Sequence, residues 1–211
     1  TVNFQILKAS EYGVPQHRRR VFFIGTKNGE KFEFPLPTHK EQEDLILKKM
    51  VSTYDALHDL PILKSELGEP IQEYTLPVQN AYQELMRHNS NHVLNHIAAN
   101  HSDKVKETIK LVPPGKNYKA LPEELRNSRN FNVAWTRFPD HAPSPTIDTG
   151  HRHHFHYYAN RVPTVRECAR LQSFPDRFEF VGNKTEQFRQ VGNAVPPVLA
   201  QTLAKKILEK L

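Results

Sequence analysis

Residues 12–25, YGVPQHRRRVFFIG, set three consecutive arginines, Arg18, Arg19 and Arg20, directly before the apolar run 21–24. The run is apolar enough for a buried strand, and the glycine and proline ahead of it favour a turn. Burying charge is costly, so positive charge at the mouth of a core strand needs an explanation. Two interpretations stay open on these residues alone: a site that uses the charge, or a solvated charge cluster at a strand end.

Composition limits the classes of protein to which the chain can belong. It has 211 residues, a hydrophobic share of 37% and a net charge of +6. The lean hydrophobic share indicates either much loop or a core that another polypeptide completes. The positive charge makes an acidic partner such as nucleic acid plausible. One cysteine excludes an internal disulfide and a cysteine-based zinc site. No signal peptide or membrane-length apolar run is visible, so we expect a cytoplasmic protein.

The ends of the chain show regular patterns, and the middle does not. Residues 3–7 and 21–24 predict two strands joined by loop 8–20, and a start in mid-strand at Thr1 suggests a cut or processed end. In the irregular, proline-rich region 26–160 we expect helices only near 41–57 and 103–111. Ser102 is the expected N-cap of the second helix.

Two further helices are predicted near the C-terminus. Thr164 and Glu167 form a capping box that starts one helix, and Pro175 ends it. The other begins with Pro196 and Pro197 in its first turn, where missing N–H groups cost little. Its apolar stripe consists of Leu199, Leu203, Ile207 and Leu211.

Three blocks of this sequence resemble one family. YGVPQHRRRVFFIG resembles the Gln-x-Arg-x-Arg block of the DNA (cytosine-5) methyltransferases. RVPTVRECARLQSFPD, residues 161–176, and QVGNAVPPVLAQTLA, residues 190–204, resemble that family's next and last blocks. Each block is moderately specific, but three in the right order, framing almost the whole chain, are very specific.

The resemblance implies a fold and a division of the chain. The fold is the C-terminal part of a doubly wound α/β, S-adenosylmethionine-dependent methyltransferase, with a smaller, irregular, mostly-β target-recognition domain. Residues 1–30 would belong to the catalytic domain and 31–160 to target recognition. Residues 161–190 would form the hinge, and 191–211 a helix returning to the catalytic domain.

The resemblance also assigns roles around the arginines. Gln16 would lock the loop, Arg18 would hold the phosphate beside the target base, and Arg20 would reach the O2 side of a flipped cytosine. The physical argument agrees, because a base must leave the stack before its ring is reached. Guanidinium groups suit phosphate and carbonyl oxygens, and fixed cationic donors aimed at developing charge favour catalysis. Arg19 keeps the solvated interpretation, since the motif skips it.

Further site residues follow from the other blocks and the middle region. By resemblance Asn193, Ala194 and Val195 border the S-adenosylmethionine site, although Asn193 can also simply start the last helix. Arg166 would brace the hinge between the domains. The expected contacts with DNA, beside Arg18, are Arg137, Thr146, Arg152 and Arg161.

Histidines and the lone cysteine invite other chemistry. The stretch APSPTIDTGHRHHFHYY, residues 142–158, holds four histidines, but their spacing matches no usual zinc pattern. We therefore expect no metal, and imidazoles that face DNA or solvent. Cys168 follows Glu167, whereas the family's nucleophile follows a proline, so we expect Cys168 to pack as a small apolar residue.

The sequence also lacks parts that the family needs. It contains no Pro-Cys pair, no Phe-x-Gly-x-Gly loop and no Glu-Asn-Val block. We expect an N-terminal catalytic half, on the same longer chain or a separate subunit, to supply the nucleophile. The hypothesis is part of an enzyme that methylates cytosine C5 in a specific duplex DNA sequence, in a restriction-modification system. The alternative is a noncatalytic sequence-specific DNA-binding or regulatory homologue.

Overall fold

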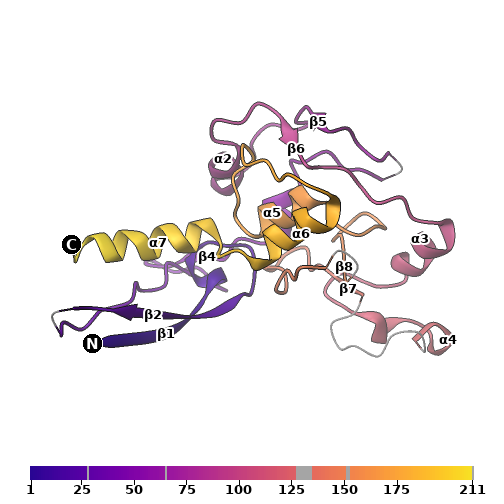
Figure 1. The fold of residues 1–211 in the computed structure, drawn as a ribbon. Coiled ribbons are helices and arrows are strands. Elements are labelled where there is room, and N and C mark those ends of the chain that lie inside the picture. The colour runs from indigo at the N-terminus through magenta and orange to yellow at the C-terminus, as the bar shows by residue number, and fades with distance from the viewer. Residues whose placement is uncertain (28, 65, 127–134, 151–152, 211) are drawn as a thin grey trace.

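The computed structural model describes residues 1–27, 29–64, 66–126, 135–150 and 153–210, which form a mixed α/β fold (Figure 1). The α-helices are α1 (Thr53–Leu57), α2 (Ala81–Arg87), α3 (Asp103–Lys110), α4 (Glu123–Arg126), α5 (Val165–Leu171), α6 (Lys184–Asn193) and α7 (Pro197–Leu208). Two 3-10 helices, η1 and η2, span Ala9–Tyr12 and Tyr118–Ala120. The strands are β1 (Val2–Lys8), β2 (Arg19–Gly25), β3 (His39–Lys40), β4 (Lys48–Lys49), β5 (Ile71–Gln72), β6 (Val93–Leu94), β7 (Thr136–Arg137) and β8 (His154–Phe155). No described helix has the length and apolarity that crossing a membrane requires.

Strands β1 and β2 pair antiparallel and confirm the two strands predicted from the sequence, each slightly longer than expected. One face of this pair carries Leu7, which is 1% exposed and clusters with Tyr12 of η1 and Leu199 of α7. Helix α7 runs alongside the pair, and both chain ends lie at the same end of the molecule (Figure 1). The predicted C-terminal helix is therefore confirmed, and Leu199 in its first turns packs in the same cluster as Leu7.

The other face of the strand pair is exposed. Phe4 and Phe23 lie opposite each other in the register, with rings 5.7 Å apart, and are 70% and 65% exposed. The expectation of a buried run at 21–24 is thus wrong: Val21 and Phe23 are exposed, and Phe22 and Ile24 are only partly buried. We call the exposed face the apolar ladder; its members are Val2, Phe4, Ile6, Val21 and Phe23.

The main core forms around α5, which is buried along its whole length. Its start confirms the predicted capping box: Thr164 accepts from the Glu167 backbone, and Glu167 accepts from the Thr164 backbone. The surrounding apolar cluster draws on α1, α2 and α6, and on residues as far apart as Ala56 and Val191. This core crosses the expected domain boundary at residue 160, so α5 packs with the middle region.

Arg170 of α5 lies fully buried between two carboxylates. Its guanidinium donates to Asp176 at 2.6 Å and to Asp59 at 3.0 and 3.2 Å, and it also reaches the carbonyl of Ala56. Burial acts to lower the pKa of Arg170, but the two carboxylates outweigh it and hold the pKa above its usual value. The three-way ion pair fixes α1 against α5.

The middle region corrects two expectations. The helix expected near 41–57 is only α1, because Asp44 accepts from the backbone of Leu47 in a turn and a Ser52–Asp55 capping box starts the helix late. The region is also not mostly β: each of its described strands is two residues long, and these strands lie between short helices and loops. Helix α3 confirms the helix predicted after Ser102, although Ser102 makes no side-chain cap bond.

Helix α6 was not predicted from the sequence. Its start carries a recognisable signal, since the side chain of Asn183 accepts from the backbone of Glu186. The following helix α7 is capped from a distant turn, because Ser173 Oγ accepts from the Val198 backbone at 3.1 Å. Ser173 adopts a φ of 62°, a left-handed conformation that is uncommon for a residue with a side chain.

Replacing Arg170 with methionine tests the ion pair. Arg170→Met keeps much of the side-chain length but removes the shortest ion pairs of the buried Asp59 and Asp176, which keep only longer contacts to other arginines, at 3.5 and 3.9 Å. We expect a loss of about 3–5 kcal/mol in the free energy of unfolding, measured by urea titration. The control Arg189→Met removes an exposed i,i+3 pair with Glu186 and should change stability by less than about 1 kcal/mol. Equal effects of the two variants would contradict this role of Arg170.

Candidate functional site

Gln16 joins the loop before β2 to two distant segments. It is fully buried, and its Oε1 accepts from the backbone of Ile147 at 2.9 Å. Its Nε2 donates to Gln172 Oε1 at 2.5 Å and to the carbonyl of Leu171 at 3.2 Å. Gln16 therefore fixes the loop in place through its side chain.

Arg18 is also turned inward. It is 2% exposed, and it donates from Nη1 to the carbonyl of Ile147 at 3.0 Å and from Nη2 to that of Gly192 at 2.7 Å. Its buried Nε has no hydrogen-bond partner among the described residues. Burial and the nearby Arg20 lower the pKa of Arg18 to about 10. The guanidinium remains a cation at neutral pH, and it holds two backbone segments together.

Those two segments cross at Gly192. A methyl group on Gly192 would lie 2.3 Å from the carbonyl oxygen of Asp148 and 2.7 Å from the backbone nitrogen of Thr149. Both neighbours are backbone atoms, so only glycine permits this approach of α6 to residues 146–149. Arg18 binds carbonyls on both sides of the crossing and so stabilises it.

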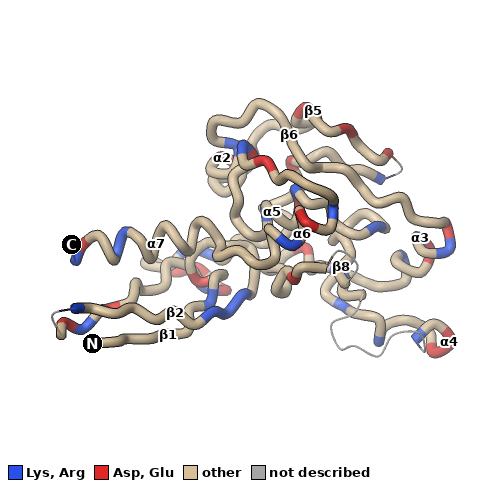
Figure 2. Tube along the Cα trace, in the orientation of Figure 1, with Lys and Arg blue, Asp and Glu red and all other residues tan. Residues whose placement is uncertain are grey.

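The arginines after Arg18 point to solvent. Arg19 and Arg20 are exposed, and within the described part of the chain neither has an acidic partner at ion-pair distance. Figure 2 shows this basic stretch at the start of β2, where the strand pair joins the rest of the molecule. Lys8 lies directly across from Arg19, a like-charge placement that disfavours the strand pair. Positive charge is thus concentrated beside the buried Gln16 and Arg18.

Thr146 contributes to the same loop. Its hydroxyl donates to the carbonyl of His17 at 2.8 Å, and the backbone nitrogen of His17 donates to the carbonyl of Ser144. Thr146 is only half-buried. A contact of Thr146 with DNA stays a prediction, and the described contact holds the loop.

The expected cofactor edge lies at the junction of α6 and α7. Asn193 is exposed and ends α6, so it does not start the last helix. Val195 is 45% exposed, and the carbonyl of Ala194 accepts from Gln172 Nε2 at 2.9 Å. Gln172 thus contacts both Gln16 and the cofactor edge, a role that the sequence did not reveal, since a glutamine at a helix end carries no distinguishing pattern.

Arg137 and Arg161 are buried, and their guanidinium groups bind other groups of the protein. All three guanidinium nitrogens of Arg137 donate, mainly to backbone carbonyls such as those of Val112 and Ile109. Arg161 pairs with both oxygens of Glu167, at 2.7 and 2.8 Å. Both arginines therefore have structural roles here, and their contacts with DNA stay predictions; Arg152 lies outside the described residues.

Arg166 also has a bridging position. It is fully buried, and it donates to the carbonyls of Leu94, Pro175 and Phe178. These contacts join α5 to β6 of the middle region and to the loop before α6. They are the kind of bracing expected of this residue, although a hinge motion stays a prediction.

The histidines of residues 151–156 differ from expectation. His154 and His156 are buried, not facing DNA or solvent, because they fill spaces beside Phe138 and Glu167. His156 Nδ1 accepts from the backbone of Tyr158 and Ala159, so the ring is neutral with its proton on Nε2. His153 is exposed, and His151 lies outside the described residues. Among the described residues, no group of three or more His, Cys, Asp or Glu is arranged to hold a metal.

The only cysteine is equally enclosed. Cys168 is 3% exposed within the main core, and burial raises the pKa of its thiol. A thiol acts as a nucleophile through its thiolate, which this environment disfavours. Cys168 packs as the small apolar residue expected from the sequence.

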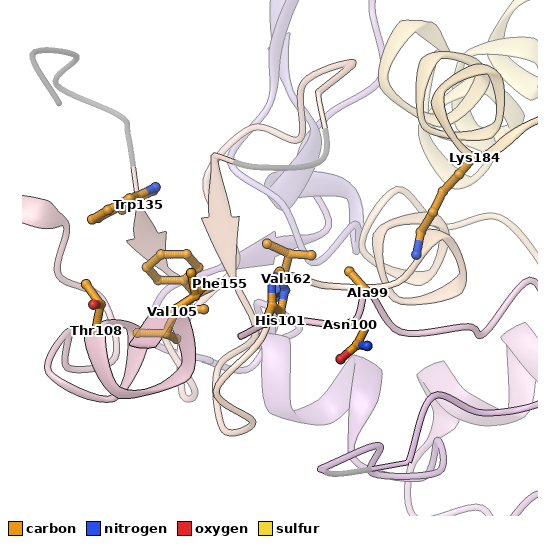
Figure 3. Close-up of a pocket in the computed structure, with 10 residues that line it drawn as sticks. Ala99, Asn100, His101, Val105, Thr108, Trp135, Phe155, Val162 and Lys184 are labelled. Carbon is orange, nitrogen blue, oxygen red and sulfur yellow. Dashed lines mark hydrogen bonds between the residues drawn. The ribbon is translucent and has the colours of Figure 1, made fainter. Parts of the chain in front are cut away.

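A separate apolar pocket of about 350 Å³ lies beside α3 (Figure 3). Trp135, Phe155 and Val162 line it, together with the polar His101 and Lys184. Lys184 donates to the carbonyl of Ile97, and His101 accepts from the backbone of Val162, so both polar groups serve the protein. The pocket shares no lining residue with the Gln16–Arg18 loop.

Comparisons with known proteins agree on one family. A family model described as C-5 cytosine-specific DNA methylase matches residues 1–209. The type II methyltransferase M1.HphI of Haemophilus parahaemolyticus is 37% identical over 99% of this chain and 48% of its own length. M.DdeI of Desulfomicrobium norvegicum is 36% identical over 96% of this chain and 53% of its own. The chain thus spans about half the length of these relatives.

A solved structure supports the same relationship. It is that of a putative DNA modification methyltransferase encoded within an E. coli prophage, with 27% sequence identity and a TM-score of 0.75. The match covers 99% of this chain and 60% of the other.

The buried His156 predicts a pH dependence of stability. Burial lowers its pKa to about 3, although Glu167 acts in the opposite direction. An unfolded histidine has a pKa of about 6.5. The unfolded chain therefore binds the extra proton first as the pH falls. Stability should decrease below about pH 6.5, by about 1.4 kcal/mol per pH unit for this group, down to about pH 3.

Urea titrations at several pH values measure that slope. His156→Asn keeps an acceptor for the two backbone N–H groups but cannot titrate, so its curve should be flatter between pH 6.5 and 4. The control His141→Asn alters an exposed side chain and should keep the wild-type slope. An unchanged slope in His156→Asn would show that another group controls this range.

Proposed function

The chain belongs to the C-5 cytosine-specific DNA methylase family, and from this we propose that it forms the C-terminal part of a DNA (cytosine-5) methyltransferase. In this proposal the complete enzyme transfers a methyl group from S-adenosylmethionine to C5 of cytosine in a specific duplex sequence. The relatives named type II methyltransferases support a role in a restriction-modification system. We propose a cytoplasmic location for the enzyme. The observation that carries the proposal is the exposed Arg20 beside the rigidly held Gln16 and Arg18.

Arg20 is the proposed catalytic donor. It is exposed at the start of β2, and its one described bond goes to the neighbouring carbonyl of Arg19. A guanidinium in this place is free to meet the O2 side of an extrahelical cytosine, where negative charge grows when a thiolate adds to C6. Cationic donors that are already in place stabilise such charge without reorganisation.

Arg18 is the proposed contact to the phosphate beside that base. Its support is the unpaired, buried Nε, because an unmatched buried donor is costly unless an acceptor arrives on binding. Its other nitrogens hold the carbonyls of Ile147 and Gly192, so the same residue also sets the loop geometry.

Asn193, Ala194 and Val195 are proposed to form one edge of the cofactor site. The side chain of Asn193 and part of Val195 are exposed at a junction held by Gln172, which suits a border of a binding site. When bound, S-adenosylmethionine supplies the methyl group. The residues present fit an edge of such a site, and the remaining walls would come from the N-terminal half.

The fold of the complete enzyme is proposed to be doubly wound, with residues 1–30 and 191–211 in its catalytic domain. Residues 31–160 are proposed to read the DNA sequence, and residues 161–190 to connect the two. Phosphate contacts position a protein on DNA, whereas contacts to base edges specify the sequence. The irregular loops of the middle region suit the second task.

The apolar ladder is proposed to receive the N-terminal half. A two-stranded pair is marginal by itself, and large exposed apolar surfaces mark interaction sites. The half-length coverage of the relatives is consistent with a missing partner for these strands. Phe4 and Phe23 are its largest exposed side chains.

Complementation tests the proposal. The chain alone should transfer no methyl group to DNA, because it carries no Pro-Cys nucleophile. A polypeptide with the N-terminal half of a relative should bind it and restore transfer of labelled methyl groups from S-adenosylmethionine. The double variant Phe4→Asp and Phe23→Asp should abolish binding in a pull-down, whereas Leu45→Asp, at an exposed site elsewhere, should not.

Two outcomes would count against the proposal. Methylation by the purified chain alone would refute the need for a partner. Sequence-specific DNA binding without methylation, despite stable association of both halves, would favour the noncatalytic alternative.

Arg20→Ala separates chemistry from binding in the completed enzyme. We expect a loss of roughly 3 kcal/mol of transition-state stabilisation, or about a hundredfold in kcat, with a much smaller change in DNA affinity. Single-turnover methylation and DNA titrations measure the two effects. Arg19→Ala, an adjacent exposed arginine, is the matched control and should keep kcat. Normal turnover in Arg20→Ala would remove its catalytic assignment.

A further inference from the structure

The turn after α5 touches three parts of the candidate site. Leu171, Gln172 and Ser173 are each at most 1% exposed. The carbonyl of Leu171 accepts from Gln16, and the hydroxyl of Ser173 accepts from the backbone of Val198 at the start of α7. Gln172, between them, contacts both sides at once.

Both the nitrogen and the oxygen of the Gln172 side-chain amide have hydrogen-bond partners. Its Nε2 donates to the carbonyls of Val191 and Ala194, at 3.1 and 2.9 Å. Its Oε1 accepts from Gln16 Nε2 at 2.5 Å. A flipped amide would set nitrogen against nitrogen and oxygen against two carbonyl oxygens, so only this orientation satisfies the three partners.

These hydrogen bonds connect the loop that carries Arg18 and Arg20 to the proposed cofactor edge. On one side Gln16 precedes Arg18 by two residues and Arg20 by four, and it also binds the Ile147 backbone. On the other side Ala194 belongs to the proposed cofactor edge. The side-chain amide of the buried Gln172 is the only group between them.

We propose that Gln172 is a positioning residue for methyl transfer, holding the loop of Arg18 and Arg20 in register with the cofactor edge at Ala194. This inference rests on the proposed function. Transfer between two bound groups requires both to be held in one geometry, and a displacement of about 1 Å can cost a hundredfold in rate. Two neighbouring glutamines provide that register, because each amide has directional partners that packing alone does not supply.

Gln172→Met in the completed enzyme is the first test. Methionine has a similar length and fills the space, but it makes none of the three hydrogen bonds. We expect kcat per folded molecule to fall at least tenfold, while DNA affinity changes less than threefold. The control is Gln190→Met on α6, where an exposed glutamine donates to the carbonyl of Val181, and kcat should be unchanged.

Gln16→Glu supplies a readout that a purely structural role would not give. A protonated carboxyl at this position can still donate to Gln172 Oε1 and accept from Ile147, whereas an ionised carboxylate cannot donate. The kcat of this variant should therefore fall as the pH rises through the pKa of the introduced carboxyl. The wild-type enzyme should show no such step, and Gln16→Glu combined with Gln172→Met should lose it.

The outcomes distinguish the inference from the proposed function. No methyl transfer by the wild-type completed enzyme would overturn the proposed function, and this inference with it. An active wild type together with normal kcat in Gln172→Met, even at reduced thermal stability, would overturn the inference alone. If Gln172→Met does not fold, the pH profile of Gln16→Glu decides: a step supports the positioning role, and a flat profile overturns it.

Discussion

Buried guanidinium groups that donate to backbone carbonyls hold the irregular parts of this chain together. Loops without regular ladders leave carbonyl oxygens unpaired, and burying them unmatched is costly. Arginine offers five donors in a fixed planar fork, enough for several carbonyls from different segments. Within the described part of the chain, the arginines buried in this way are Arg18, Arg137, Arg161, Arg166 and Arg170. A sequence lean in apolar residues thereby gains a fixed core.

This constraint separates arginines that serve the fold from those free to serve function. Arg161 and Arg170 have carboxylate partners, whereas Arg18 binds only carbonyls and keeps its Nε unpaired. Arg20 is exposed at the end of the same loop. The net positive charge is therefore not a uniform signal for DNA, because several of its cations are internal.

Local patterns in the sequence predicted what local physics decides. The Thr164–Glu167 capping box and helix α3 follow from nearby residues, and so do the two strands predicted at residues 3–7 and 21–24. Distant partners decided the rest. The burial of Arg137 depends on carbonyls of α3 and of residues 156–159, and no spacing within the sequence announces that. Family resemblance identified Gln16 and Arg18, but it did not reveal that Gln172 joins Gln16 to the carbonyl of Ala194.

The contacts that fix the candidate site are made mostly to backbone atoms. They therefore place little restriction on the side chains of the middle region, which is proposed to read the DNA sequence. Gln16 and Arg18 bind the nitrogen and the carbonyl of Ile147, not its side chain. Gln172 likewise binds the carbonyls of Val191 and Ala194. Backbone groups are present whatever the side chain, so the middle region can change most of its residues and still present the same anchor at Ile147. The proposed recognition region, attached in this way, is free to vary in sequence while the loop that carries Arg20 keeps its geometry.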